Sequence, residues 1–137
     1  MSADRFQAFL AGDDTLRIYR GGKLVFSSQK DRLLPLMDYL AAGKDWRAPC
    51  IVYDKVMGNA AALLSVIAKA REVFSPLGSE LAVKTLDRFG IKYRLAKIVP
   101  FIMRDDGQGL CPMEQLSIDK SPDDFYVIMK ARIESGK

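Results

Sequence analysis

The sequence predicts an α/β fold in which a mixed five-stranded sheet carries helices on both faces. One observation is a hairpin signal, two alternating apolar segments at residues 15–20 and 23–27 joined by Gly21-Gly22. The other is the β-α-β-α-β order of residues 48–99, whose short connections imply parallel strands and right-handed crossovers. The length of 137 residues fits one domain, residues 1–137.

Two short helices flank the hairpin in the sequence. Residues 3–11 predict a helix that ends at Gly12, a residue type that commonly terminates helices. Residues 31–42 place leucine, methionine and tyrosine at helical spacing. Because proline is tolerated in the first turn, this second helix is expected to begin near Pro35 and to end at Gly43.

The centre of the sheet is predicted by a continuous apolar segment at residues 48–53, which ends at Asp54. Such a segment is typical of a strand that is buried on both faces. Residues 56–70 follow as a helix that is apolar almost all round. A helix of this kind is covered on more than one side, and a second copy of the chain is one candidate cover. We therefore expect a homo-oligomer.

The remaining elements complete the sheet and its helices. We expect a strand at 72–75, a helix at 78–89, an edge strand at 91–99, an ordered loop at 100–112 and a last helix at 122–133. Lysine and arginine interrupt the apolar residues of the 91–99 strand, which is typical of a protected sheet edge.

The composition excludes several kinds of chemistry. The chain has no histidine, which excludes His-based acid–base catalysis and disfavours catalytic zinc. Cys50 and Cys111 are too few for a disulfide framework, and Cys50 is expected to be a buried core residue. Asp105 and Asp106 precede Gly107, which indicates a turn more than a cation site. No metal and no cofactor are therefore expected.

Charge and hydropathy bear on partners and location. Residues 47–104 hold ten basic and four acidic side chains, but the basic ones are spread singly, which does not favour nucleic-acid binding. We see no signal peptide and no apolar stretch long enough to cross a membrane. A cytoplasmic location without membrane attachment is the expectation.

A candidate site lies where the parallel strands end, because open α/β sheets bind ligands at their carboxyl edge. Asp54 ends the buried strand, where it can cap the next helix or contact a ligand. The helix that follows begins with Lys55, and its free N–H groups favour an anion. Gly58 allows close packing or close ligand approach. The candidate ligand-binding residues are Ser27, Ser28, Asp54, Lys55, Gly58, Asn59, Cys111 and Glu114.

The segment Cys111-Pro112-Met113-Glu114 is the most specific local feature. Pro112 fits the first position of a helix, which places Cys111 at the N-cap and Glu114 where it can cap the Cys111 backbone. A thiol at a helix N-terminus has a lowered pKa, so a reactive Cys111 is one interpretation. The nearby Glu114 carboxylate opposes a negative sulfur.

Three segments together resemble a known family. They are residues 54–64, Val99-Pro100-Phe101-Ile102, and residues 106–114 with the string Gly-Leu-Cys-Pro-Met-Glu. Over residues 14–119 the chain resembles a prokaryotic family called domain of unknown function 1893. The resemblance implies a cytidine-deaminase-like, three-layer αβα sandwich. Asn59 stands where the family's motif has lysine.

The resemblance does not carry zinc-deaminase chemistry. Zinc deaminases need a His or Cys with a Glu on one helix and Pro-Cys-x-x-Cys on the next. The predicted helix at 31–42 has no such ligands, and Cys111-Pro112 reverses the order of that motif. The resemblance therefore implies a deaminase-like scaffold that lacks the zinc site.

Three functions follow from these residues. The first is binding of a small anionic or nucleotide-like ligand near Asp54 and Cys111. The second is a metal-independent enzyme in which Cys111 or Asp54 reacts and Lys55 is an acid or electrostatic clamp. The third is an oligomeric interaction module. The identity of the ligand and of any reaction stays open.

Overall fold

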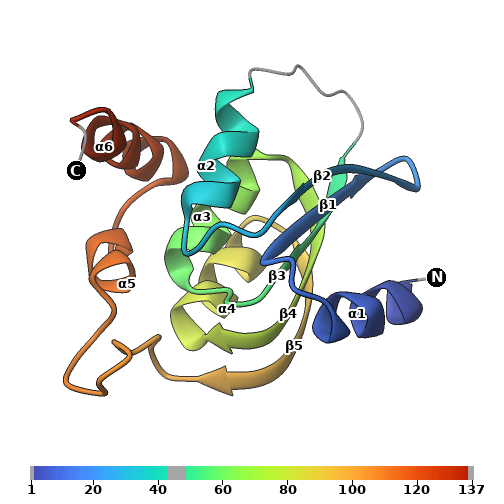
Figure 1. Cartoon of the computed structure of the whole chain (residues 1–137). Coiled ribbons are helices and arrows are strands. Elements are labelled where there is room, and N and C mark those ends of the chain that lie inside the picture. Colours follow the sequence, from blue (N-terminus) through green and yellow to red (C-terminus); the bar gives the residue numbers. More distant parts are fainter. Residues whose placement is uncertain (1, 43–48, 136–137) are drawn as a thin grey trace.

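The computed structural model describes residues 2–42 and 49–135. A five-stranded sheet of strand order β2-β1-β3-β4-β5 forms its middle layer (Figure 1). β1 pairs antiparallel with both β2 and β3, whereas β3, β4 and β5 are mutually parallel. The predicted mixed five-stranded α/β sheet is confirmed, with the apolar strand β3 at its centre and β5 at an edge.

The elements follow one another in the order that the sequence predicts, including the short helix that begins at Pro112 with Cys111 as its N-cap. They are α1 (Ser2–Ala11), β1 (Leu16–Arg20), β2 (Lys23–Ser28), α2 (Leu34–Ala41), β3 (Cys50–Asp54), α3 (Asn59–Ile67), β4 (Ala70–Ser79), α4 (Glu80–Arg88), β5 (Lys92–Val99), α5 (Pro112–Ser117) and α6 (Pro122–Glu134). The predicted helix end at Gly43 and the first residue of the 48–53 strand lie outside the described residues.

One face of the sheet packs on α1 through aromatic side chains. Phe6 and Phe9 of α1 lie against Tyr53 of β3 and Phe74 of β4, and all four are buried. The Tyr53 and Phe74 rings stack with centroids 4.7 Å apart. Because side chains alternate along a strand, Val52 and Cys50 of β3 face the opposite layer.

The other face of the sheet packs on α2, α3 and α4 (Figure 1). α3 contacts α2, α4, α5, α6 and the sheet, and its residues from Asn59 to Ser65 are buried. The expectation of a helix covered on more than one side is therefore confirmed. The argument for a homo-oligomer is not, because helices of the same chain supply this cover.

Three elements differ from their predicted bounds. β4 spans Ala70–Ser79 and not 72–75, α3 spans Asn59–Ile67 and not 56–70, and α4 begins at Glu80 and not at residue 78. The later starts of α3 and α4 and the late end of β4 have one cause. Met57 forms a parallel bridge with Gly78, with a 2.7 Å hydrogen bond from the Met57 N–H to the Leu77 carbonyl. The segment after β3 thus remains extended and prolongs the pairing of β4.

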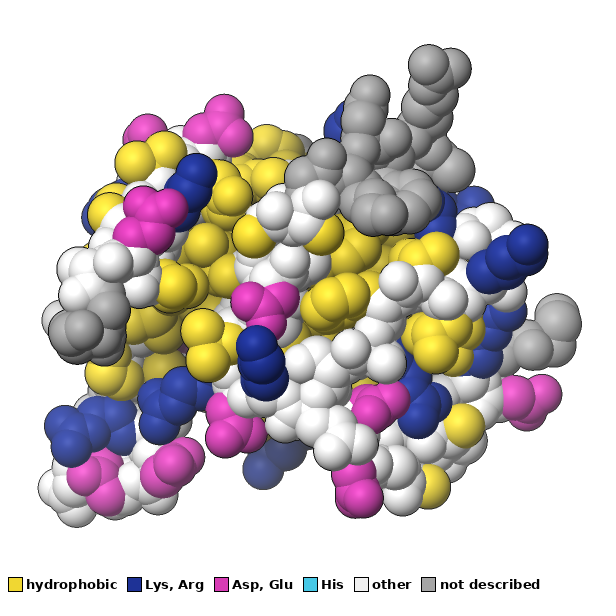
Figure 2. Space-filling model, turned by 45° about the horizontal axis from the view of Figure 1, so that its top comes forward, with side chains coloured by type: hydrophobic (Ala, Val, Ile, Leu, Met, Phe, Trp, Pro, Cys, Tyr) yellow, Lys and Arg dark blue, Asp and Glu magenta, His cyan; other side chains and the backbone are white. Residues whose placement is uncertain are grey.

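The surface in Figure 2 shows Lys and Arg side chains interspersed with Asp and Glu, with apolar side chains between them. In the described part of the chain, no helix is both long enough and apolar enough to cross a membrane.

Candidate functional site

A cavity of about 430 Å³ lies beyond the carboxyl end of β3, the edge at which the sequence predicts a site. Its volume is within the range of small-molecule sites. The walls come from the residue before β1, the segment before α2, the β3–α3 connection, the first turn of α3, the loop after β5 and the start of α5. The lining residues are Thr15, Asp31, Arg32, Leu33, Asp54, Lys55, Val56, Gly58, Ala60, Ala61, Ile102, Met103, Asp105, Cys111, Met113 and Glu114.

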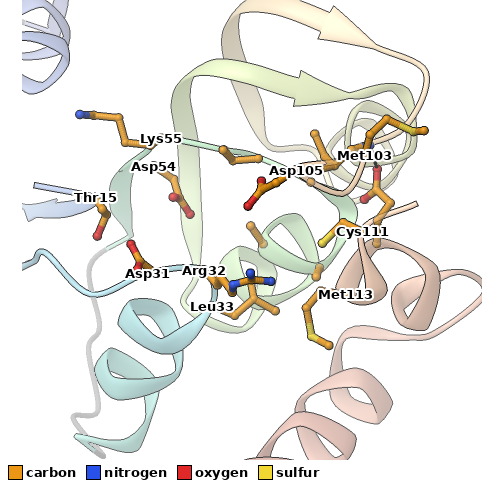
Figure 3. A pocket seen from close by; sticks show the side chains of 16 residues that line it. Thr15, Asp31, Arg32, Leu33, Asp54, Lys55, Met103, Asp105, Cys111 and Met113 are labelled. Atoms are coloured by element: carbon orange, nitrogen blue, oxygen red, sulfur yellow. Dashed lines mark hydrogen bonds between the residues drawn. The ribbon is translucent and has the colours of Figure 1, made fainter. Parts of the chain in front are cut away.

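Asp54 places a carboxyl group inside this cavity. Its residue is 7% exposed, and Figure 3 shows the side chain pointing into the space between the walls. Burial raises the pKa of this carboxyl to about 7, although hydrogen bonds from the Val56 and Lys55 backbone act in the opposite direction. The N-cap of α3 is Gly58, so the predicted capping role of Asp54 is wrong.

Glu114 occupies the start of α3. Its side chain is buried, and its Oε1 accepts a 2.7 Å hydrogen bond from the Asn59 N–H. The Oε2 atom accepts a 2.7 Å hydrogen bond from the Ile102 N–H, so one carboxylate joins α3, α5 and the loop after β5. The predicted cap of the Cys111 backbone is wrong, because the Cys111 N–H donates to the Ile102 carbonyl at 2.9 Å.

This arrangement corrects the expectation of an anionic ligand at the first turn of α3. A negative charge near a helix N-terminus is favourable, but the chain supplies that charge itself. Gly58 allows the contact, since a Cβ atom there would lie 3.0 Å from Glu114 Oε1. Gly58 is thus required for packing of the chain against itself.

Asn59 is a structural residue whose side chain faces neighbouring helices. Its Nδ2 donates to the Ser117 Oγ at 3.1 Å and the Ser117 carbonyl at 3.2 Å, and its Oδ1 accepts from the Thr85 hydroxyl. Asn59 does not line the cavity. Its hydrogen bonds join α3 to α4 and α5.

Three other candidate residues do not bring their side chains into the cavity. Lys55 Nζ donates to the Gly12 carbonyl at 3.1 Å and lies 4.9 Å from the Phe9 ring centre, turned toward α1 (Figure 3). Ser28 Oγ accepts a hydrogen bond from the Lys30 N–H. Neither Ser27 nor Ser28 lines the cavity. The Lys55 ammonium group therefore lies against α1 in this structure, which does not favour its predicted role as an acid or clamp.

The sequence analysis missed Thr15, Asp31 and Arg32, which line the cavity from the segments around the hairpin. Arg32 has a backbone φ of 63°, a conformation that residues other than glycine and asparagine rarely adopt. No sequence motif marks these three residues. The segment between β2 and α2 reaches the same edge because β1 runs antiparallel to β3.

The loop after β5 is ordered, as predicted. Met103 and Leu110 form an antiparallel bridge, and Asp106 Oδ1 accepts a 2.9 Å hydrogen bond from the Gln108 N–H. This turn is the role expected of the Asp-Asp-Gly segment. Met103 and Asp105 from the loop line the cavity.

The two cysteines differ in setting. Cys50 is buried, its Sγ donates to the Ala68 carbonyl at 3.4 Å, and burial raises the pKa of its thiol to about 11. Cys50 is thus a core residue, as predicted. Cys111 is half-buried and lines the cavity, and α5, which it precedes, has six residues.

No group of three or more Cys, Asp or Glu residues that could hold a metal ion occurs within residues 2–42 and 49–135. The cavity lining contains four carboxyl groups, from Asp31, Asp54, Asp105 and Glu114, against Arg32 and Lys55. Because Lys55 points away and Glu114 is hydrogen-bonded to backbone, the open part of the cavity is acidic.

A protein-family model matches most of the sequence. The model of a domain of unknown function, DUF1893 (TM1506), matches residues 6–132. The chain belongs to the DUF1893 family. No curated protein matches it. A similar solved structure is that of a DUF1893 family protein (TM1506) from Thermotoga maritima, with a TM-score of 0.85 and 23% sequence identity. The similarity covers 96% of this chain and 88% of the other.

Membership of the DUF1893 family agrees with the resemblance noted in the sequence. The TM1506 structure supports the fold over the 96% of this chain that it covers and assigns no activity. Neither match names a deaminase, so a cytidine-deaminase-like relationship stays a prediction.

Proposed function

We propose that this DUF1893 domain binds a small polar molecule in the cavity between β3 and α5. The observation that carries the proposal is the Asp54 carboxyl, which is buried in a cavity of about 430 Å³ and has no side-chain cation as a partner in the described residues. A buried carboxylate costs free energy unless hydrogen bonds or an opposite charge compensate for lost water, and the Val56 and Lys55 backbone N–H groups compensate only in part. A bound molecule with a hydrogen-bond donor would compensate further.

The walls suggest the shape of the ligand. Leu33, Val56 and Ile102 offer apolar surface on different sides, whereas the acidic groups are few and separate. Binding sites of this type enclose an apolar body and orient it through a small number of polar groups. A nucleotide fits this description poorly, because its phosphates would meet the carboxylates.

The test is an NMR titration of the amide resonances with amines, nucleosides, nucleotides and sugar phosphates. Binding in the cavity shifts the amides of Val56, Gly58 and Ile102 together, while amides of α6 stay in place. A thermal-shift assay checks the same panel, since ligand at about 100 times Kd adds about 2.7 kcal/mol to stability. A panel with no cavity shifts at millimolar ligand would contradict the proposal.

A metal-independent enzyme is the second candidate, and the pKa of about 7 at Asp54 favours it. A carboxyl that titrates near neutrality can both accept and donate a proton in general acid–base catalysis. Cys111 lines the same cavity and is the available nucleophile. Turnover of a bound compound that Asp54→Asn abolishes at saturating ligand would support this function, and turnover unchanged in that variant would exclude Asp54.

A further inference from the structure

We propose that the cavity selects organic cations, such as amines, amidines and guanidines, over neutral and anionic molecules of the same shape. This inference rests on the proposed function and names the class of ligand. Its basis is the arrangement of three carboxyl groups around one apolar cavity.

The three carboxyl groups come from separate segments and face the same space. Figure 3 shows Asp31, Asp54 and Asp105 with their carboxyl groups turned toward the interior of the cavity. Asp54 lies at the end of β3, Asp31 before α2 and Asp105 in the loop after β5. None of them forms a salt bridge within the described residues.

Asp54 is the deepest of the three, with a residue exposure of 7%, whereas Asp31 and Asp105 are exposed. A charge-assisted hydrogen bond at such a buried carboxylate is stronger than one at the surface, because water competes less. The two exposed carboxylates add a negative potential at the mouth, which attracts cations at long range. A cation would therefore be attracted to the cavity mouth by Asp31 and Asp105 and bound inside it by Asp54.

The cationic side chains of the lining are fewer than its carboxyl groups. Lys55 lies in the lining but directs its ammonium group to the Gly12 carbonyl and the Phe9 ring. Arg32 is exposed and precedes α2. Glu114 neutralises the start of α3 with its own charge. One exposed guanidinium therefore faces three carboxyl groups.

The apolar walls distinguish an organic cation from a metal ion. Leu33, Val56, Ile102 and Met113 offer no ligands to a bare ion, but they can cover an alkyl or aryl body. In the described ranges no three Cys, Asp or Glu side chains form a metal-holding group. The ligand that matches both the charge and the walls is a cation attached to an apolar group.

The test uses benzamidine, benzamide and benzoate, which share one shape and carry positive, zero and negative charge. Calorimetric titrations are run at pH 8, because Asp54 must be ionised to hold a cation. We expect benzamidine to bind at least about tenfold more tightly than benzamide, and benzoate to bind least tightly. Of the three probes, only benzamidine should bind less tightly at higher salt concentration.

Asp54→Asn is the decisive variant, since it keeps the shape and removes the charge. We expect it to reduce benzamidine affinity to that of benzamide and to leave benzamide within about twofold. Asp123→Asn on α6, an exposed residue outside the cavity, is the matched control and should leave both affinities unchanged. A circular dichroism spectrum and an unfolding curve show that each variant is folded.

Several outcomes would overturn the inference. Equal affinity for benzamidine and benzamide would remove charge selection and leave the small-molecule function intact. Tighter binding of benzoate would assign the cavity to anions through Arg32. Stabilisation by Mg²⁺ alone that Asp54→Asn abolishes would replace the organic cation with a metal ion. No binding of any probe, together with an empty NMR screen, would overturn both proposals.

Discussion

At the scale of a single residue, the neighbours of Asp54 determine its chemistry. The residue ends a strand that is buried on both faces, so the core around its carboxyl excludes most water. Desolvation is the largest contribution to its raised pKa, and the Val56 and Lys55 amides compensate only in part. Such a carboxyl lowers the stability of the fold when it is ionised.

The raised pKa makes stability depend on pH with a definite sign. An unfolded Asp titrates near 3.9, and the folded carboxyl titrates at about 7. Between these values the folded state binds more protons, so the Asp54 contribution to the free energy of unfolding falls as pH rises. The slope reaches about 1.4 kcal/mol per pH unit, and the contribution levels off above pH 7.

The measurement is urea unfolding of the wild type and of Asp54→Asn between pH 4 and 8. We expect the variant to gain stability relative to the wild type as pH rises, by a few kcal/mol in all. Asp123→Asn controls for the loss of one surface charge. A difference between the variant and the wild type that stays constant with pH would show that Asp54 is ionised in the folded state throughout.

Gly58 is the second residue whose role one substitution can measure. Its φ of −80° suits alanine, so Gly58→Ala has no backbone strain. A Cβ there would lie 3.0 Å from both Glu114 Oε1 and Ile102 Cγ1. We expect a loss of about 1–3 kcal/mol from this overpacking, measured by chemical unfolding.

Gly12→Ala is the matched control for that substitution. Its nearest neighbour is the end of the Arg17 side chain at 3.3 Å, which can move away at little cost. Equal effects of the two substitutions would mean that the contact between Glu114 and α3 tolerates displacement.

At the scale of elements, Glu114 holds three of them at one edge of the cavity. The carboxylate accepts from Asn59 at the start of α3 and from Ile102 in the loop after β5, while Glu114 itself belongs to α5. Each hydrogen bond to a charged group contributes about 1.5–3 kcal/mol. The wall formed by the loop and α5 therefore depends on one side chain.

Glu114→Ala removes both acceptors and should lower stability by about 2–4 kcal/mol, because two backbone N–H groups lose their partner. Hydrogen exchange at the Ile102 and Asn59 amides should become faster than at amides of β3. Glu114→Gln retains one acceptor and should have a smaller effect, and Glu134→Ala on the exposed part of α6 serves as control. Unchanged exchange at both amides would contradict the linking role.

Prediction from sequence succeeded where local patterns decide the structure. The Gly21-Gly22 hairpin has the positive φ values, 60° and 80°, that its sequence indicates, and β3 is central as its apolar run predicts. Prediction failed where contacts between residues far apart in the sequence determine the structure. Met57 and Glu114 each bind residues more than ten positions away, so neither the extension of β4 nor the acceptor of the α3 N-terminus follows from local spacing.

At the scale of the whole molecule, the sheet separates two cores of different character. Aromatic rings fill the space under α1, and mainly aliphatic side chains, with a few aromatic ones, fill the space between the sheet and α2, α3 and α4. The cavity opens at the edge of the larger, aliphatic core, where the β3–α3 connection leaves the sheet. Rigid elements thus support the cavity from behind, while the loop after β5 forms part of its wall.

The position of α3 in that core gives a prediction about association as well as stability. Leu64 is fully buried by elements of its own chain. Leu64→Ala should cost about 2–5 kcal/mol, measured by urea unfolding, because it leaves a cavity in a packed core. Val127→Ala, at a side chain that is 65% exposed, should change stability by less than about 0.5 kcal/mol.

Sedimentation of the same two variants shows whether α3 is covered by elements of its own chain or by a second copy of the chain. If the covering elements all belong to one chain, folded Leu64→Ala sediments like the wild type at every concentration. An interface between copies built on α3 would behave differently, because a smaller side chain would weaken association and shift the sedimentation coefficient at micromolar concentration. A shift in Leu64→Ala without one in Val127→Ala would therefore place a partner copy against α3 and contradict its burial within a single chain.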